Sequence, residues 1–236
     1  MASWLGTPTI DEDKVGITFV DVLFALVVGE ILGPLRRWWT IPAVGWSHLA
    51  VALALTLGSW IGYHSSANKP RYPIEFFNLP FAQFILDIAM VITYWLTATS
   101  AEVSEHIGTR DIAAHSFSAV PESLLVTASF VLYAAWDQVA RLMKAAPYYV
   151  NQLASPEDKG RRTVTLIFLA VSAVVLGIAV VVQSHRLPST WVVSIDVLLV
   201  IELLAYRAAK EWWSARVANR AEPPEDRPPT PGAPAT

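Results

Sequence analysis

The 236-residue chain contains no cysteine, and only 16% of its residues are charged. Without cysteine it can form no disulfide, no thiolate metal site and no thiol nucleophile. The first charged residues are mostly acidic, whereas a secretory signal would begin with a basic stretch, so we expect no cleavable signal. The net charge of −3 indicates no particular partner. Because cysteine is absent and charged residues are few, the class of this protein must be read from its apolar residues.

Apolar residues are abundant: 54% of the chain is hydrophobic and its mean hydropathy is +0.43. They fall into six long blocks, each close to the ~20 residues that a helix needs to cross a bilayer. The runs are continuous rather than alternating, which argues against a closed β-barrel. The sequence therefore predicts an all-α, polytopic membrane protein with six transmembrane helices at residues 15–32, 47–63, 77–97, 122–143, 163–183 and 191–209.

The basic residues predict the orientation of these six spans. Cytoplasmic loops carry an excess of Lys and Arg, and most of the basic residues lie on the side that holds both termini. Those on the opposite side are Arg36, Arg37, Arg110 and Arg186. We expect a multi-pass protein of the plasma membrane with a cytoplasmic N-terminus (1–14), a transmembrane domain (15–209) and a cytoplasmic, mostly disordered, proline-rich tail (210–236).

An aspartate in the first apolar block is the most informative polar residue. Asp21 lies about 9 Å into the membrane at about 1.5 Å per residue. The second block returns to a similar depth at its end, and the third begins there. Ionised groups in hydrocarbon are costly and usually face a partner or a polar pathway. The depths predict a cluster of Asp21 with Ser59, Trp60, His64 and Asn78, which is either a structural hydrogen-bond network or an ion or proton site.

Other intramembrane acids offer alternatives. Asp87 lies near the middle of the third block without a local basic partner, so it is a candidate for proton handling, together with Glu202. Asp196 lies six residues before Glu202, so these two do not share a tight helix face. Asp137 and Arg141 are spaced i, i+4 and are expected to pair locally.

The sequence contains no pattern of a metal or enzyme site. The histidines and acids of the third loop have no spacing typical of a ligand set. The pair Gly58-Ser59 is not followed by the glycine that a rhomboid-type serine site needs. We therefore expect no catalytic residue, no metal, no cofactor and no nucleic-acid partner.

Residues 19–26, which begin Phe19-Val20-Asp21, resemble the Phe-Ser-Asp signature in helix one of the lysosomal-type (transmembrane protein 175-like) potassium channels. The end of the second block, with Trp60 and His64 four apart, is similar to the aromatic-plus-histidine ending of helix two in that family. Val20 replaces the serine of the signature. Bacterial members have six helices and cytoplasmic termini, and their signature is held by hydrogen bonds to neighbouring helices.

The resemblance implies a potassium-permeable homotetramer with helix one lining a central pore. The hydrophobic constriction of the family falls on Leu26, which would gate by wetting. The same face of this helix would line the pore with Val22, Gly29, Glu30 and Gly33. No Thr-Val-Gly-Tyr-Gly filter is present, so selectivity by a conventional carbonyl filter is excluded.

Two other functions remain open at this point. A proton-coupled small-solute transporter would use Asp87 and Glu202, but such proteins usually carry half-repeats with broken helices, and none is visible. A membrane scaffold without transport would need no intramembrane site at all.

Overall fold

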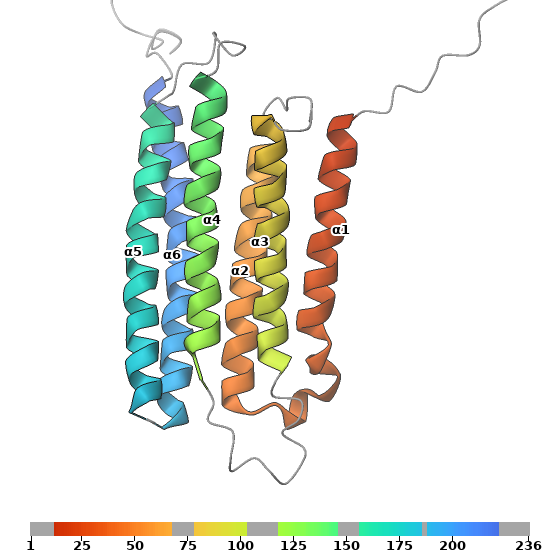
Figure 1. The fold of residues 1–236 in the computed structure, drawn as a ribbon, viewed down its shortest axis with the longest axis vertical. Coiled ribbons are helices and arrows are strands. Elements are labelled where there is room, and N and C mark those ends of the chain that lie inside the picture. Colours follow the sequence, from red (N-terminus) through yellow and green to blue (C-terminus); the bar gives the residue numbers. More distant parts are fainter. Residues whose placement is uncertain (1–11, 68–77, 103–117, 146–155, 186–187, 222–236) are drawn as a thin grey trace, which may run out of the picture.

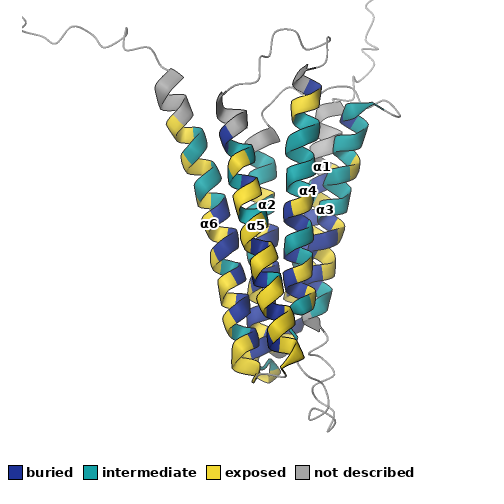
Figure 2. Ribbon diagram, turned by 60° about the vertical axis from the view of Figure 1, so that its left-hand side comes forward, coloured by how far each residue is buried: buried dark blue, intermediate teal, exposed yellow. Residues whose placement is uncertain are grey.

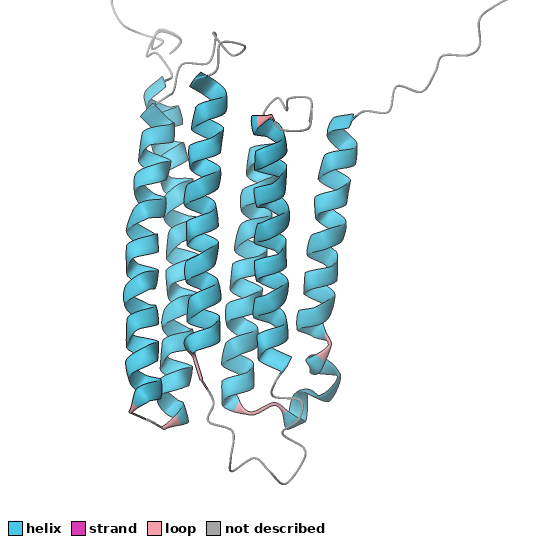
Figure 3. Cartoon of the chain, in the orientation of Figure 1, coloured by secondary structure: helices cyan, strands magenta, loops and turns pink. Residues whose placement is uncertain are grey.

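The computed structural model describes residues 12–67, 78–102, 118–145, 156–185 and 188–221. These residues form six α-helices and one short 3-10 helix, and no β-strand occurs in the described part of the chain (Figure 3). In chain order the elements are α1 (Glu12–Leu32), η1 (Pro34–Thr40), α2 (Ala43–Ala67), α3 (Leu79–Glu102), α4 (Val120–Ala145), α5 (Pro156–Ser184) and α6 (Ser189–Ala221). The prediction of an all-helical chain is confirmed.

Each predicted apolar block coincides with one helix, but the helices extend beyond the blocks. α5 starts at Pro156, since proline at the first helical position loses no hydrogen bond. α6 continues to Ala221, so residues 210–221 of the expected tail are helical, while 222–236 lie outside the described residues. The sequence did not predict η1, which begins at Pro34. A polar residue can end an apolar block without ending the helix, because the backbone hydrogen bonds of a helix also form outside the membrane.

Four helices are long and apolar enough to cross a membrane. Their apolar segments are Ala43–His64, Leu79–Ser100, Val120–Met143 and Gly160–Ser184. Large apolar side chains on the outside of the bundle fit this assignment, for example Ile167, Val174 and Val181 on α5 (Figure 2). In water such an apolar face would promote aggregation, whereas in a bilayer it can contact the lipid tails. By length and composition α2 to α5 can thus cross a membrane, and the crossing of α1 and α6 remains a prediction.

The helices run antiparallel along one common direction (Figure 1). α2 packs against α3 and α6, and α4 packs against α3 and α5. α1 lies at one edge and packs mainly on α2 and α3, which leaves one of its faces uncovered. The first residue of α1 and the last residue of α6 lie at the same end of the bundle, the upper end in Figure 1.

Aromatic side chains fill the centre between α4, α5 and α6. Phe130 is fully buried and its ring lies 5.0 Å from that of Tyr206, in an edge-on arrangement. Tyr206 also stacks on Tyr133, with ring centroids 5.6 Å apart. Edge-to-face and offset aromatic pairs are favoured by their quadrupoles. Inside a bilayer, such close packing and the polar contacts between helices hold a bundle together.

Candidate functional site

Three of the residues that the sequence predicts at the same depth in the membrane, Asp21, Trp60 and His64, are in contact in the structure. Asp21 Oδ1 lies 2.8 Å from His64 Nε2 and accepts a hydrogen bond of 3.2 Å from Trp60 Nε1. The Trp60 and His64 rings lie 4.6 Å apart, so that both donors reach the same carboxylate oxygen. Because Asp21 is on α1 and its partners are one turn apart on α2, this contact fixes α1 against α2.

The other residues assigned to this network have different contacts. Ser59 forms a short hydrogen bond with the Tyr133 hydroxyl, because neighbouring residues on a helix point about 100° apart and Ser59 faces α4. Asn78 lies at the start of α3, where its Oδ1 accepts the Phe81 backbone N–H at 2.9 Å. Phe19 packs against Phe84 on α3, with ring centroids 6.1 Å apart.

The face of α1 that the family resemblance assigns to a pore is uncovered in the single chain. Leu26 is 63% exposed and Val22 is 54% exposed. Gly29 is exposed on the same side, and a methyl group there would meet nothing within 4 Å. Glu30 is half-buried at the far end of the row, and Gly33 donates its N–H to the carbonyls of Gly29 and Glu30. This row has no charged side chain between Val22 and Gly29.

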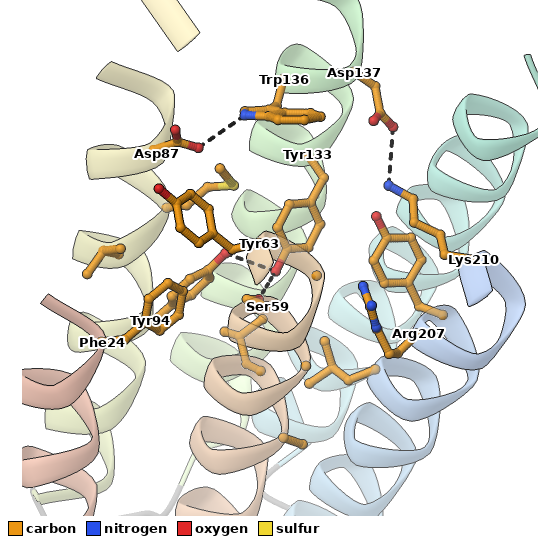
Figure 4. Close-up of a pocket in the computed structure, with 18 of the residues that line it drawn as sticks. Phe24, Ser59, Tyr63, Asp87, Tyr94, Tyr133, Trp136, Asp137, Arg207 and Lys210 are labelled. Atoms are coloured by element: carbon orange, nitrogen blue, oxygen red, sulfur yellow. Dashed lines mark hydrogen bonds and ion pairs between the residues drawn. The ribbon is translucent and has the colours of Figure 1, made fainter. Parts of the chain in front are cut away.

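A cavity lies inside the bundle and is lined by residues from all six α-helices, including Phe24 of α1 and Tyr94 of α3 (Figure 4). The volume open to the centres of water molecules is about 100 Å³. One water needs about 10–15 Å³ on this measure, so the cavity has room for several. Its walls are aromatic, with Tyr63, Tyr94, Tyr133, Trp136 and Tyr206. Local sequence patterns do not predict this cavity, because each helix contributes only a few separate residues to its lining.

Three charged residues of this cavity, Asp87, Asp137 and Lys210, make contacts between helices. The Trp136 indole donates to Asp87 Oδ1 at 3.0 Å. Thr165 Oγ1 donates to Asp137 Oδ2 at 2.7 Å, and Lys210 Nζ lies 3.4 Å from the same oxygen. The expected local pair of Asp137 with Arg141 is absent from the described side chains, and Arg141 is exposed. Asp137 points into the bundle, where cations from α6 are available, so a long-range pair replaces the local one.

Glu202, the second acid considered for proton handling, lies on α6 away from these contacts. It is 4% exposed, and neither carboxylate oxygen has a hydrogen-bond partner among the described residues. Asp87 and Glu202 are thus not joined by any contact that the structure describes. Each would have to act alone in a proton-handling role.

Sequence reasoning missed a second group of ionisable residues near the opposite end of the bundle. His48, Glu122 and Asp196 come together there although they are far apart in the chain. All three lie within about the first two turns of their helices, on α2, α4 and α6. The depth comparison that grouped Asp21 with Trp60 and His64 would also have grouped these three, had it been applied to that end of the blocks.

Comparison with protein-family models, with curated proteins and with solved structures gave no match to this chain.

Proposed function

We propose that the chain is one subunit of a potassium-permeable cation channel of the plasma membrane, with six membrane-spanning helices and both termini in the cytoplasm. Four copies surround a pore lined by α1, and rings of Leu26 form its constriction. The observation that carries the proposal is the contact of Asp21 with Trp60 and His64, which corresponds to the signature contact between helices one and two in the family that residues 19–26 resemble.

The uncovered face of α1 supports the same function. A helix that lines an axis between subunits must present a face that its own subunit does not pack against, and Val22, Leu26 and Gly29 form such a face. Apolar side chains at a constriction gate ion flow by dewetting. Anchoring of Asp21 to α2 would orient this face, so we assign the aspartate a structural role beside the pore and not a place at its narrowest point.

The arrangement of the subunits can be tested by disulfide cross-linking, because the natural chain has no cysteine. In a Leu26→Cys variant, the thiols of subunits around a common axis meet and form disulfide-linked dimers on oxidation. Leu204→Cys is the matched control, since Leu204 is 57% exposed on α6 and would face lipid. Efficient cross-linking of Leu26→Cys alone supports α1 at the axis, and cross-linking of neither variant contradicts it.

Ion conduction is tested separately with purified protein in proteoliposomes. Leu26→Asn makes the constriction wettable, so we expect potassium flux to rise about tenfold, which corresponds to a barrier lowered by about 1.4 kcal/mol. Leu204→Asn should leave the flux unchanged. If neither the natural protein nor the Leu26 variant conducts potassium, the channel proposal is wrong.

The cavity favours solute transport as a second candidate function. It holds Asp87 and three cationic side chains, Arg161, Arg207 and Lys210, beside aromatic walls. Pockets with apolar walls and a few polar groups are typical of small-molecule sites. In this case a pH gradient would drive uptake, Asp87→Asn would abolish it, and Leu26 substitutions would have no effect. A protein that is monomeric in mild detergent and moves neither ion nor solute would be a scaffold.

A further inference from the structure

Three ionisable side chains from three helices meet near the end of the bundle that is opposite the start of α1. His48 of α2, Glu122 of α4 and Asp196 of α6, with the neighbouring Ser47, are named here the His48 cluster. The exposed fractions of His48, Glu122 and Asp196 are 6%, 2% and 0%. Neither the cavity nor the pore-facing residues of α1 include any of them.

One imidazole nitrogen faces both carboxylates. His48 Nδ1 lies 3.1 Å from Asp196 Oδ2 and 3.5 Å from Glu122 Oε1. Nδ1 thus lies within ion-pair distance of both acids, although its N–H direction gives no hydrogen bond to either in this arrangement. Among the described residues no group of three such side chains has the geometry of a metal site, so the proton is the cation that this arrangement fits.

The Ser47 hydroxyl can adapt to either protonation state of Asp196. Its Oγ lies 2.6 Å from Asp196 Oδ2 and 2.9 Å from the Val44 carbonyl oxygen. A hydroxyl has one proton and rotates freely. It donates to Asp196 when that carboxylate is ionised, and to the carbonyl when Asp196 carries a proton of its own.

Charge balance requires the cluster to bind protons. Fully deprotonated, it would bury two negative charges, which costs several kcal/mol per ion in a low-dielectric interior. A protonated His48 compensates one of them. Among the described side chains the remaining carboxylate has no cation, and Glu122 Oε2 and Asp196 Oδ1 have no hydrogen-bond partner there. A second proton on one of these acids makes the cluster neutral.

Among the side chains that the structure describes, no other charged group acts on His48 or Glu122. The charges that act on His48 come from Glu122 and Asp196, and those that act on Glu122 come from His48 and Asp196. On other elements, Glu30 in α1 is half-buried, and Arg36 in η1 and His185 in α5 are exposed. None of these three is among the charges that act on the cluster.

We propose that His48, Glu122 and Asp196 form a buried proton-binding site that joins α2, α4 and α6. In the loaded state it holds two protons, one on the imidazole and one on a carboxyl group, and is neutral. Loss of a proton leaves a net negative charge between three packed helices and loosens their packing at this end. The proposal is independent of ion conduction, and a channel, a transporter or a scaffold could carry such a site.

Infrared spectroscopy of the protein in lipid vesicles tests the site directly. At neutral pH we expect the C=O stretching band of a protonated carboxyl group, which shifts in D₂O and disappears as the pH is raised. Glu122→Gln or Asp196→Asn should remove this band. Glu202→Gln and Asp87→Asn are the controls, since they remove acids outside the His48 cluster and should leave it in place. A carboxyl band that neither Glu122→Gln nor Asp196→Asn alters at any pH would overturn the proposal.

Histidine resonances provide a second measurement that needs no altered carboxylate. With ¹⁵N-labelled imidazole, both ring nitrogens of His48 should carry protons at neutral pH, and one should be lost over the pH range in which the carboxyl band disappears. The chain has five histidines, so His48→Gln suffices to assign the signal. A His48 ring that is neutral throughout this range overturns the proposal, whatever the flux assays give.

Discussion

The indole ring of Trp213 in α6 lies directly against the backbone of Gly160 in α5, so that a methyl group at position 160 would overlap the ring. Glycine is required here by the close approach of the two helices and not by a special backbone angle. The contact lies near the end of the bundle where the cavity opens, next to Arg161 and Lys210.

Gly160→Ala should therefore lower the stability of the protein by about 1–3 kcal/mol, the usual cost of overpacking a filled site. The measurement is the thermal midpoint of the protein in detergent, followed by tryptophan fluorescence. Gly177→Ala, also in α5, is the matched control, because its methyl group would meet nothing within 4 Å. That variant should be unchanged or slightly stabilised by helix propensity. Equal midpoints for the two variants would show that Trp213 does not occupy this place.

The hydrogen bond of Trp60 to Asp21 should appear as a coupling energy. Both side chains are more than a third exposed, so we expect only about 0.5–1 kcal/mol from a double-mutant cycle of Asp21→Asn and Trp60→Phe. A parallel cycle of Asp21→Asn with Trp191→Phe uses a tryptophan of the opposite end and should give additive effects. Additivity in both cycles would mean that the indole contact is not formed in the membrane.

Glu30 should influence cation flux if α1 lines the pore. It follows Leu26 by one helical turn, and four copies would form a negative ring near the entrance. Such a ring concentrates cations, so Glu30→Gln should reduce potassium flux several-fold at low ionic strength and much less at high ionic strength, where the charge is screened. Glu211→Gln, in the exposed part of α6, is the control and should not change the flux. A reduction of potassium flux that does not depend on salt would contradict the electrostatic role of Glu30.

The pair of Asp137 and Lys210 should show rescue by a second substitution. The two side chains are 12% and 11% exposed, and Arg161 and Arg207 add further positive charge near Lys210. Asp137→Asn keeps a partner for Thr165 but leaves the cations without their acid, which should cost about 3 kcal/mol. Lys210→Met in the same chain should recover a large part of this loss. The measurement is the thermal midpoint of the two single variants and of the double variant. Strictly additive losses of stability would contradict the pairing.

The helices were predictable because each apolar block has the length of a bilayer crossing, a property that depends on single segments alone. The contact of Asp21 with Trp60 and His64 was predictable too, since adjacent antiparallel segments fix the relative depth of their residues. Ser59 shows where this reasoning ends. Depth placed it beside Asp21, but its direction around the helix axis takes it to Tyr133.

Contacts between segments that are distant in sequence needed the structure. Asp137 has a basic residue at i+4 and yet pairs with Lys210, because the rotation of α4 in the bundle directs its carboxylate towards α6. His48 is one polar residue in an apolar stretch, and its two acids come from the fourth and sixth helices. Only the packing of α2 against α4 and α6 brings these groups within hydrogen-bonding range.

α6 carries Asp196 near one end and Lys210 near the other, about 21 Å apart along the helix axis at about 1.5 Å per residue. A helix is stiff along its length, so α6 acts as a rod that is fixed to other helices by ionic contacts at two distant points. A slide by one turn would break both attachments at once. The two attachments therefore hold the axial position of α6 at two separate levels of the bundle.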